Sequence, residues 1–325
     1  MTSSARDSLV LKIVRLLHNL DYAQALPLMA KLPLCLGYML SELRGVINGC
    51  IGRDWRSMAL GTRHVARHTA EGLRLLKPLA SEPELHALVR ERFQTESREE
   101  FEGRLIAAGR VPELHWAIAP ADFLSNCLQQ REKGLLLLTP HFDSFMLGIA
   151  FLGLAGVKVN VMTSSLNDPR ISAAVQEHFF RKYRGMEDVM NGGRMLDKEK
   201  GLRPFYQMLE RGECLVILAD IPAEAGGVTA SPQFLGCRRL LSGGALRMAR
   251  KTGSDIGAFV CRCDKPGNYR VQGGPIVAAR DPQSLDIVYS FLSEEIQATP
   301  GKWWASYLLP LMTPVDQSSP GGRTC

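Results

Sequence analysis

His141 stands where a histidine could do acid–base chemistry. It follows a run of four leucines, 135–138, that ends in Thr139-Pro140. Such a run is typical of a strand buried on both faces, and the carboxyl ends of strands in an open α/β sheet point into the ligand crevice. An imidazole at that position is suited to take a proton near neutral pH. The competing interpretation is a histidine that only caps the following helix.

Two carboxylates could orient this imidazole. Asp143 lies two residues after His141, on a non-helical turn, from which it could reach the ring or cap the next helix; Ser144 beside it is a candidate substrate contact. Asp220 follows a second apolar run, 214–219, and could reach the ring only if that strand neighbours the leucine strand. Asp220 could also be a turn residue, and the ring could lack an orienting group. We expect Asp143 to orient the ring.

Basic residues supply candidate anion contacts. Arg181 and Arg184 are three residues apart on one side of a predicted helix, as a phosphate clamp requires, although a solvated charged face has the same pattern. The segment 226–254 contains no acidic residue and five basic ones, which could form a rim for an acidic carrier protein or a phosphate or could be ordinary surface charge. These five are Arg238, Arg239, Arg247, Arg250 and Lys251, of which the first two are taken as substrate-binding candidates.

Alternating strands and helices must position these side chains. Strands are predicted at 157–162, 214–219, 256–262 and 269–276, and helices at 145–157, 169–184, 201–211, 241–251 and 282–298. This alternation predicts an α/β domain at 111–314, with a mostly parallel central sheet flanked by helices. Residues 1–110 have helical periodicity and predict an N-terminal helical region, whereas 315–325 predicts a disordered tail.

Composition narrows the class of protein. The 325 residues are 46% hydrophobic and 22% charged, with a net charge of +6, which favours an acidic or phosphate-bearing partner without requiring nucleic acid. The eight cysteines have no metal-ligand spacing, so we expect reduced thiols, no metal and a cytoplasmic location. No nucleophile elbow, dinucleotide fingerprint, P-loop or HExxH motif is present.

One apolar segment could contact a membrane. Residues 25–40 are apolar but contain Pro27, Lys31 and Pro33, and they fall short of the roughly 20 residues that a spanning helix needs. The segment therefore predicts either a buried core helix or a helix that contacts a membrane surface peripherally.

Taken in order, these features resemble the bacterial late lipid A acyltransferases and their glycolipid-acylating relatives, within the lysophospholipid acyltransferase superfamily. The resemblance runs across nearly the whole chain. Its motifs are the strand and histidine at 134–148, Arg181, Arg184 and Gly185, the block from Leu209 and Gly212 to Asp220, Phe-Leu-Gly at 234–236, Leu246, Ala249 and Gly253, and Pro300, Trp303 and Trp304.

The resemblance implies cofactor-free transfer of an acyl group from an acyl carrier protein or coenzyme A thioester to a hydroxyl of a lipid-like or carrier-bound acceptor. In this interpretation His141 is the general base, and Arg181 or Arg184 binds the donor phosphate or the developing oxyanion. The apolar helix after His141 is expected to line an acyl pocket. The family's histidine is normally followed, five residues later, by an acidic residue. Met146 occupies that position here, so either Asp143 or Asp220 has taken over or the protein has diverged from standard acyl transfer.

Two alternatives to acyl transfer remain open. With water as the acceptor, the same base would release acyl or polyketide chains, as a thioesterase or lyase does. The other alternative is a non-catalytic protein that binds acyl groups or a carrier protein. For the enzyme, we expect a cytoplasmic location, peripheral on the cytoplasmic face of the inner membrane.

Overall fold

The computed structural model describes residues 3–130 and 132–315. Residues 316–325 of the predicted disordered tail therefore lie outside the described part. Val315, also included in that prediction, is described, and its N–H donates to the carbonyl of Arg238 at 2.9 Å.

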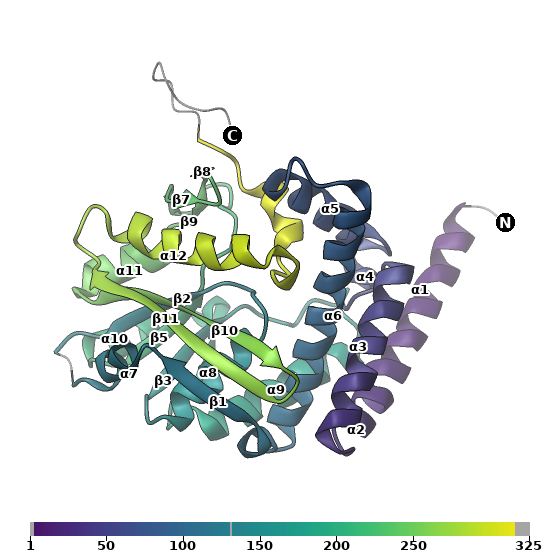
Figure 1. Ribbon diagram of the computed structural model, residues 1–325, viewed down its shortest axis with the longest axis horizontal. Helices are drawn as coiled ribbons and strands as arrows, with labels where there is room; N and C mark the ends of the chain where they lie inside the picture. Colours follow the sequence, from purple (N-terminus) through teal and green to yellow (C-terminus); the bar gives the residue numbers. More distant parts are fainter. Residues whose placement is uncertain (1–2, 131, 316–325) are drawn as a thin grey trace.

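A seven-stranded sheet forms the centre of the molecule, in the order β1-β11-β10-β2-β5-β3-β4 (Figure 1). All neighbouring pairs are parallel except β10 with β11, so the predicted mostly parallel α/β sheet is confirmed. The strands are β1 His115–Ala119, β2 Leu135–Thr139, β3 Val159–Thr163, β4 Met195–Asp197, β5 Cys214–Leu218, β10 Asp255–Lys265 and β11 Asn268–Ala278. The sequence did not predict β1 and β4.

Helices cover both faces of the sheet. The leucine strand β2 is fully buried: Leu135 and Leu137 enter one core cluster, and Leu136 and Leu138 enter the other. This alternation follows from the two-residue period of a strand. The first cluster includes side chains of α7 Ala121–Leu128, α8 Phe145–Leu154 and α9 Ala173–Val189, and the second includes those of α10 Arg203–Glu210, α11 Gly244–Thr252 and α12 Ser284–Ala298.

The predicted N-terminal helical region is present and lies at one edge of the molecule (Figure 1). Its elements are α1 Ser3–Leu20, the π-helix η1 Asp21–Ala25, α2 Leu26–Met29, α3 Leu34–Ile51, α4 Ser57–Leu60, α5 His64–Leu76 and α6 Glu82–Ala107. Ser81 is the N-cap of α6 and forms a capping box with Glu84. Among the described residues, no helix is long and apolar enough to cross a bilayer.

The apolar segment 25–40 is not one helix. It is divided between the end of η1, α2, a turn and the start of α3, because Pro33 has an extended backbone and directly precedes α3. Leu26, Met29 and Ala30 are buried in the core cluster shared with the sheet. Part of the first half of the segment is thus internal, whereas Leu28 is 63% exposed.

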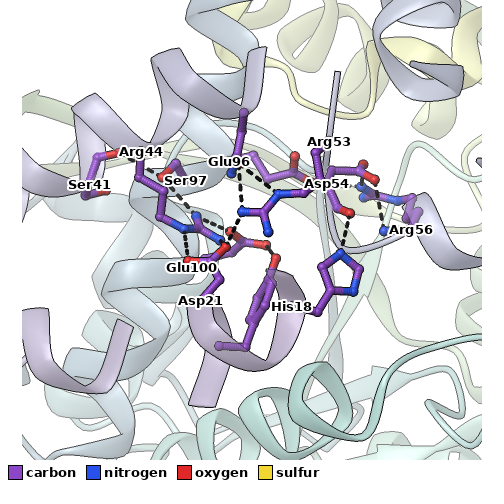
Figure 2. Close-up of polar contacts among 12 residues, drawn as sticks. His18, Asp21, Ser41, Arg44, Arg53, Asp54, Arg56, Glu96, Ser97 and Glu100 are labelled. Atoms are coloured by element: carbon purple, nitrogen blue, oxygen red, sulfur yellow. Dashed lines mark hydrogen bonds and ion pairs between the residues drawn. The ribbon is translucent and has the colours of Figure 1, made fainter. Parts of the chain in front are cut away.

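Charged side chains are buried where α3 crosses α6 (Figure 2). Arg44 of α3 pairs with Asp21 at 2.7 Å and with Glu100 of α6 at 2.6 Å. The backbones also approach closely: a Cβ at Gly45 would lie 2.5 Å from the Cα of Gln94.

After α12 come two 3-10 helices, η4 Pro300–Lys302 and η5 Ser306–Leu311, which pack against α6 and α5, respectively. Two small antiparallel pairs lie outside the main sheet. They are β6 Thr229–Ala230 with β9 Leu241–Ser242, and β7 Gln233–Phe234 with β8 Cys237–Arg238.

Candidate active site

His141 and Asp220 form a hydrogen-bonded pair at the carboxyl edge of the sheet. The strands that precede them, β2 and β5, are direct neighbours, with Thr139 paired to Leu218. One oxygen of Asp220 lies 2.9 Å from Nδ1 of His141, and the other accepts the backbone N–H of His141 at 2.8 Å. A carboxylate that holds both the ring and the backbone of a histidine fixes the position of the imidazole.

The charge on Asp220 determines the tautomer of this ring. Burial alone would raise the pKa of Asp220, but the adjacent His141 and the hydrogen bonds from His141 and Trp303 hold that pKa below its ordinary value. An ionised carboxylate can only accept hydrogen bonds, so Nδ1 of His141 carries the proton. The other ring nitrogen, Nε2, makes no hydrogen bond within the described part of the chain. It is therefore available as a base.

Aromatic rings surround the pair. The indole Nε1 of Trp303 donates to Asp220 at 2.7 Å, and Trp303 is fully buried. The rings of Trp304 and Phe145 meet the His141 ring edge-on, with centroids 4.5 Å and 5.4 Å away. Only 15% of the His141 side chain is exposed. The imidazole is thus largely enclosed by protein, with a small part exposed to solvent.

Asp143, the expected orienting residue, does not reach the ring. Its fully buried carboxylate accepts from Arg98, from Nζ of Lys302 at 3.0 Å and from the backbone N–H of Cys263 at 3.0 Å. Its φ of +48° and the bond from its own N–H to the carbonyl of Lys302 turn the side chain this way. Asp143 joins the loop after β2 to α6, β10 and η4.

Ser144 and Met146 also face the interior. The Ser144 hydroxyl donates to Glu102 of α6 at 3.0 Å, and Tyr269 donates to the same carboxyl oxygen at 2.9 Å. Burial, partly offset by Arg98, raises the pKa of Glu102 to about 8. Met146 is buried in the core, as are the other residues 145–153 of α8. This helix was expected to line an acyl pocket, but its side chains pack against other side chains of the protein.

The two arginines of α9 have different environments. Arg181 is 61% exposed and pairs with Glu177 at 2.6 Å, one helical turn away. Arg184 lines a pocket of about 310 Å³ at the carboxyl ends of β3 and β4. Its wall is mixed: Lys200 adds a second basic side chain, Glu187 and Asp197 add two acidic ones, and much of the rest is apolar. None of its lining residues belongs to the His141 pair, although the pocket lies on the same edge of the sheet.

Most of the five basic residues of 226–254 have structural contacts. Arg238 pairs with Asp286 at 2.7 Å, and the buried Arg239 donates to the carbonyls of Phe234 and Met312. On α11, Arg250 donates to the carbonyl of Ala279 and Lys251 lies over the ring of Tyr206. Because guanidinium groups that bind their own chain are not open to a ligand, the structure does not support Arg239 as a substrate contact.

Several residues around the site had not been expected there. Arg98 and Lys302 bind Asp143, and Trp303 binds Asp220. The only sequence signal for Arg98 is its spacing of four residues from Glu102 on a helix, which is equally typical of an exposed ion pair. Among the described residues, no group of three or more His, Cys, Asp or Glu side chains could hold a metal ion.

Comparison with known protein families identifies a matching family model. A family model described as bacterial lipid A biosynthesis acyltransferase matches residues 122–307, which is more than half of the chain. The matched region includes every strand of the main sheet except β1, both members of the His141 pair, and Trp303. No curated protein matches the chain closely enough to count as a relative.

Proposed function

The chain belongs to the bacterial lipid A biosynthesis acyltransferase family, and we propose that it transfers an acyl group from a carrier-protein or coenzyme A thioester to a hydroxyl of a lipid-like acceptor. The observation that carries this proposal is the His141–Asp220 pair, in which Nδ1 is held by a carboxylate and Nε2 is unbound. That arrangement is what a general base acting on an alcohol requires.

In the proposed reaction, Nε2 of His141 takes the proton of the acceptor hydroxyl while the hydroxyl oxygen attacks the thioester carbonyl. Asp220 stabilises the imidazolium that forms, because its carboxylate is charged and 2.9 Å away. When the tetrahedral intermediate collapses, the carbon–sulfur bond breaks and the thiol leaves with the proton from Nε2. An ester and a free thiol result, and the base is regenerated.

We assign to Asp220 the part that the acidic residue five positions after the histidine plays in the family. Met146, which occupies that position here, is buried among apolar side chains. Asp220 supports the assignment because it approaches the ring from the neighbouring strand and binds Nδ1 directly. The acid has thus changed its place in the sequence while an oriented imidazole is retained.

We place an anionic group of a substrate in the pocket lined by Arg184 and Lys200. The pocket opens at the carboxyl ends of β3 and β4, next to β5, whose end carries Asp220. Arg184 and Lys200 offer hydrogen-bond donors that suit a phosphate, and both must be directed to the ligand rather than to Glu187 and Asp197, which line the same pocket. Such a phosphate could belong to the acceptor or to the pantetheine arm of the donor, and Arg181, paired with Glu177, is a weaker candidate.

Members of this family work at the inner membrane, and we propose that this protein meets that membrane peripherally from the cytoplasmic face. The absence of a spanning helix among the described residues is compatible with this location. The contact is not made by 25–40 as a single helix, since part of that segment is buried.

The test is to identify the product made from a radiolabelled acyl-carrier thioester, with and without lipid-linked hydroxyl acceptors. Acyl transfer predicts label in an ester that requires both the acceptor and His141, with His141→Ala about 10² to 10⁴ slower. Label in free acid would instead show hydrolysis, and bound but unchanged thioester would show a binding protein. Circular dichroism of His141→Ala verifies that the variant is folded.

A further inference from the structure

The helix α3 has an apolar outer face. Its side chains Leu36, Met39, Leu43, Ile47 and Ile51 are 43% to 56% exposed. Successive members are three or four residues apart, so they form one stripe along a helix of 18 residues. Glu42 is the one acidic side chain exposed on this helix. A continuous apolar stripe of this length indicates a contact surface.

The inner face of the same helix is polar, which reverses the usual arrangement (Figure 2). Ser41, Arg44 and Asn48 are buried. Arg44 pairs with Asp21 and Glu100, and Asn48 accepts from Arg53, which also pairs with Asp21. These bonds prevent α3 from rotating its apolar side inward. The outer stripe is therefore a permanent surface of the folded protein.

The helix α1 lies at the same edge of the molecule as α3 (Figure 1), and its exposed side chains include apolar and basic ones. Val14 and His18 face inward, whereas Ile13, Leu16 and Leu20 are 48% to 58% exposed. Lys12 and Arg15 are also exposed. The end of α1 is tied to α3, because Asp21 directly after it pairs with Arg44.

We propose that the outer face of α3, together with the exposed side of α1, rests in the interfacial layer of an anionic lipid bilayer, with α3 parallel to the membrane plane. Helices that lie in this layer have a strongly apolar side and Lys or Arg beside it. The chain carries a net charge of +6, which complements anionic lipid. The buried Arg44 on the inner side of α3 is incompatible with the alternative of spanning the bilayer.

A bilayer suits this face better than a second copy of the chain does. A two-fold symmetric dimer places the same patch on both sides of the interface. Lys12 and Arg15 of both copies would then lie at one interface, with Glu42 as the one exposed acid on α3 to balance them. An anionic lipid surface neutralises these charges without that repulsion.

The experiment measures flotation of the purified full chain with vesicles that contain phosphatidylglycerol. The double variant Leu43→Glu/Ile47→Glu puts two charges on the stripe and should lower the affinity at least tenfold, since each apolar side chain contributes substantially when buried. Leu128→Glu is the matched control, because Leu128 is 47% exposed at the end of α7, outside these two helices. Thermal melts establish that the variants are folded.

A second variant tests the charge. Lys12→Gln/Arg15→Gln should weaken binding to phosphatidylglycerol vesicles about fivefold per charge, with little effect on vesicles of phosphatidylcholine alone. Equal binding by wild type and Leu43→Glu/Ile47→Glu would overturn the proposal. A second result would also overturn it: the wild type does not bind vesicles but is a dimer by light scattering, and Leu43→Glu/Ile47→Glu is a monomer. Flotation needs no turnover, so its outcome is independent of whether the protein transfers acyl groups.

Discussion

At the scale of single residues, two buried aspartates near His141 have different roles. Asp220 binds the ring and the backbone of His141, whereas Asp143 binds Arg98, Lys302 and the backbone of Cys263. Asp143 is therefore expected to hold in place the loop 140–144, which carries His141 and is called the active-site loop of the candidate site. Asp220 is expected to keep the imidazole in the reactive tautomer. The two roles predict different consequences of the same Asp-to-Asn change.

Asp143→Asn should mainly lower stability. The change leaves Arg98 and Lys302 without the buried negative charge that they share, and breaking a buried ion pair typically costs about 3 kcal/mol or more. Urea denaturation measures the free energy of unfolding, with the exposed Asp188→Asn on α9 as the matched control. A variant as stable as the wild type would contradict the structural role of Asp143.

The sequence located the histidine more easily than its partner. His141 follows four leucines and a proline, which is a local pattern. The pairing with Asp220 depends on β2 and β5 being adjacent in the sheet, and strand order is not encoded within either strand. Asp143 was the more obvious candidate because it is only two residues from His141. Its φ of +48°, which directs the side chain away from the ring, could not be foreseen from the sequence.

At the scale of elements, α6 connects the helical region to the active-site loop through the side chains of Arg98 and the buried Glu102. Glu102 accepts hydrogen bonds from Ser144 and Tyr269, and burial raises its pKa to about 8. Between the ordinary value of 4.5 and about pH 8, the native protein retains a proton that the unfolded chain releases. The native state then binds more protons, so this group lowers stability as pH rises, by at most about 1.4 kcal/mol per pH unit.

Glu102→Gln should therefore gain stability relative to the wild type as the pH rises from 5 to 8. Glutamine keeps an acceptor for Ser144 and Tyr269 but has no proton to lose. Free energies of unfolding at several pH values provide the measurement. The exposed Glu210→Gln is the matched control and should follow the wild type at every pH. A constant difference between Glu102→Gln and wild type would exclude the titration of Glu102.

The crossing of α3 and α6 makes a second prediction from two glycines one turn apart. A Cβ at Gly45 would lie 2.5 Å from the Cα of Gln94, whereas one at Gly49 would lie 3.4 Å from the Cβ of Phe93. Gly45→Ala should force the helices apart and cost at least about 2 kcal/mol, as overpacking does. Gly49→Ala should be neutral or stabilise by up to about 1 kcal/mol, because alanine favours the helix. Equal melting temperatures for the two variants would contradict this packing.

Strong local signals predicted elements well, and weak ones did not. The run of four leucines at 135–138 correctly predicted the strand β2. The short strands β1 and β4, with five and three residues, lack buried apolar runs and were missed. The segment 25–40 was expected to form one helix despite Pro33, but it is divided between the end of η1, α2 and the start of α3, because Pro33 has an extended backbone.

At the scale of the whole molecule, the active-site loop lies where the sheet meets the helical region. The backbone of Trp304 donates to the carbonyl of His141, and Phe142 forms a bridge with Trp303. Arg98 reaches the loop from α6. The helical region is thus part of the support of the site, and one core cluster contains side chains from both regions. The alternating pattern of the sequence predicted the α/β class, but these long-range contacts could only be seen in the folded chain.

The most direct test of the central claim is the single-turnover rate of thioester consumption by Asp220→Asn in the presence of acceptor. Asparagine can donate to Nδ1 and thereby move the ring proton to Nε2, where it blocks the base. We predict a rate about 10³ to 10⁴ below wild type, as the corresponding change produces in other histidine–aspartate pairs. A folded Asp220→Asn variant that forms ester at the wild-type rate would contradict the assignment of His141 and Asp220 as the catalytic pair.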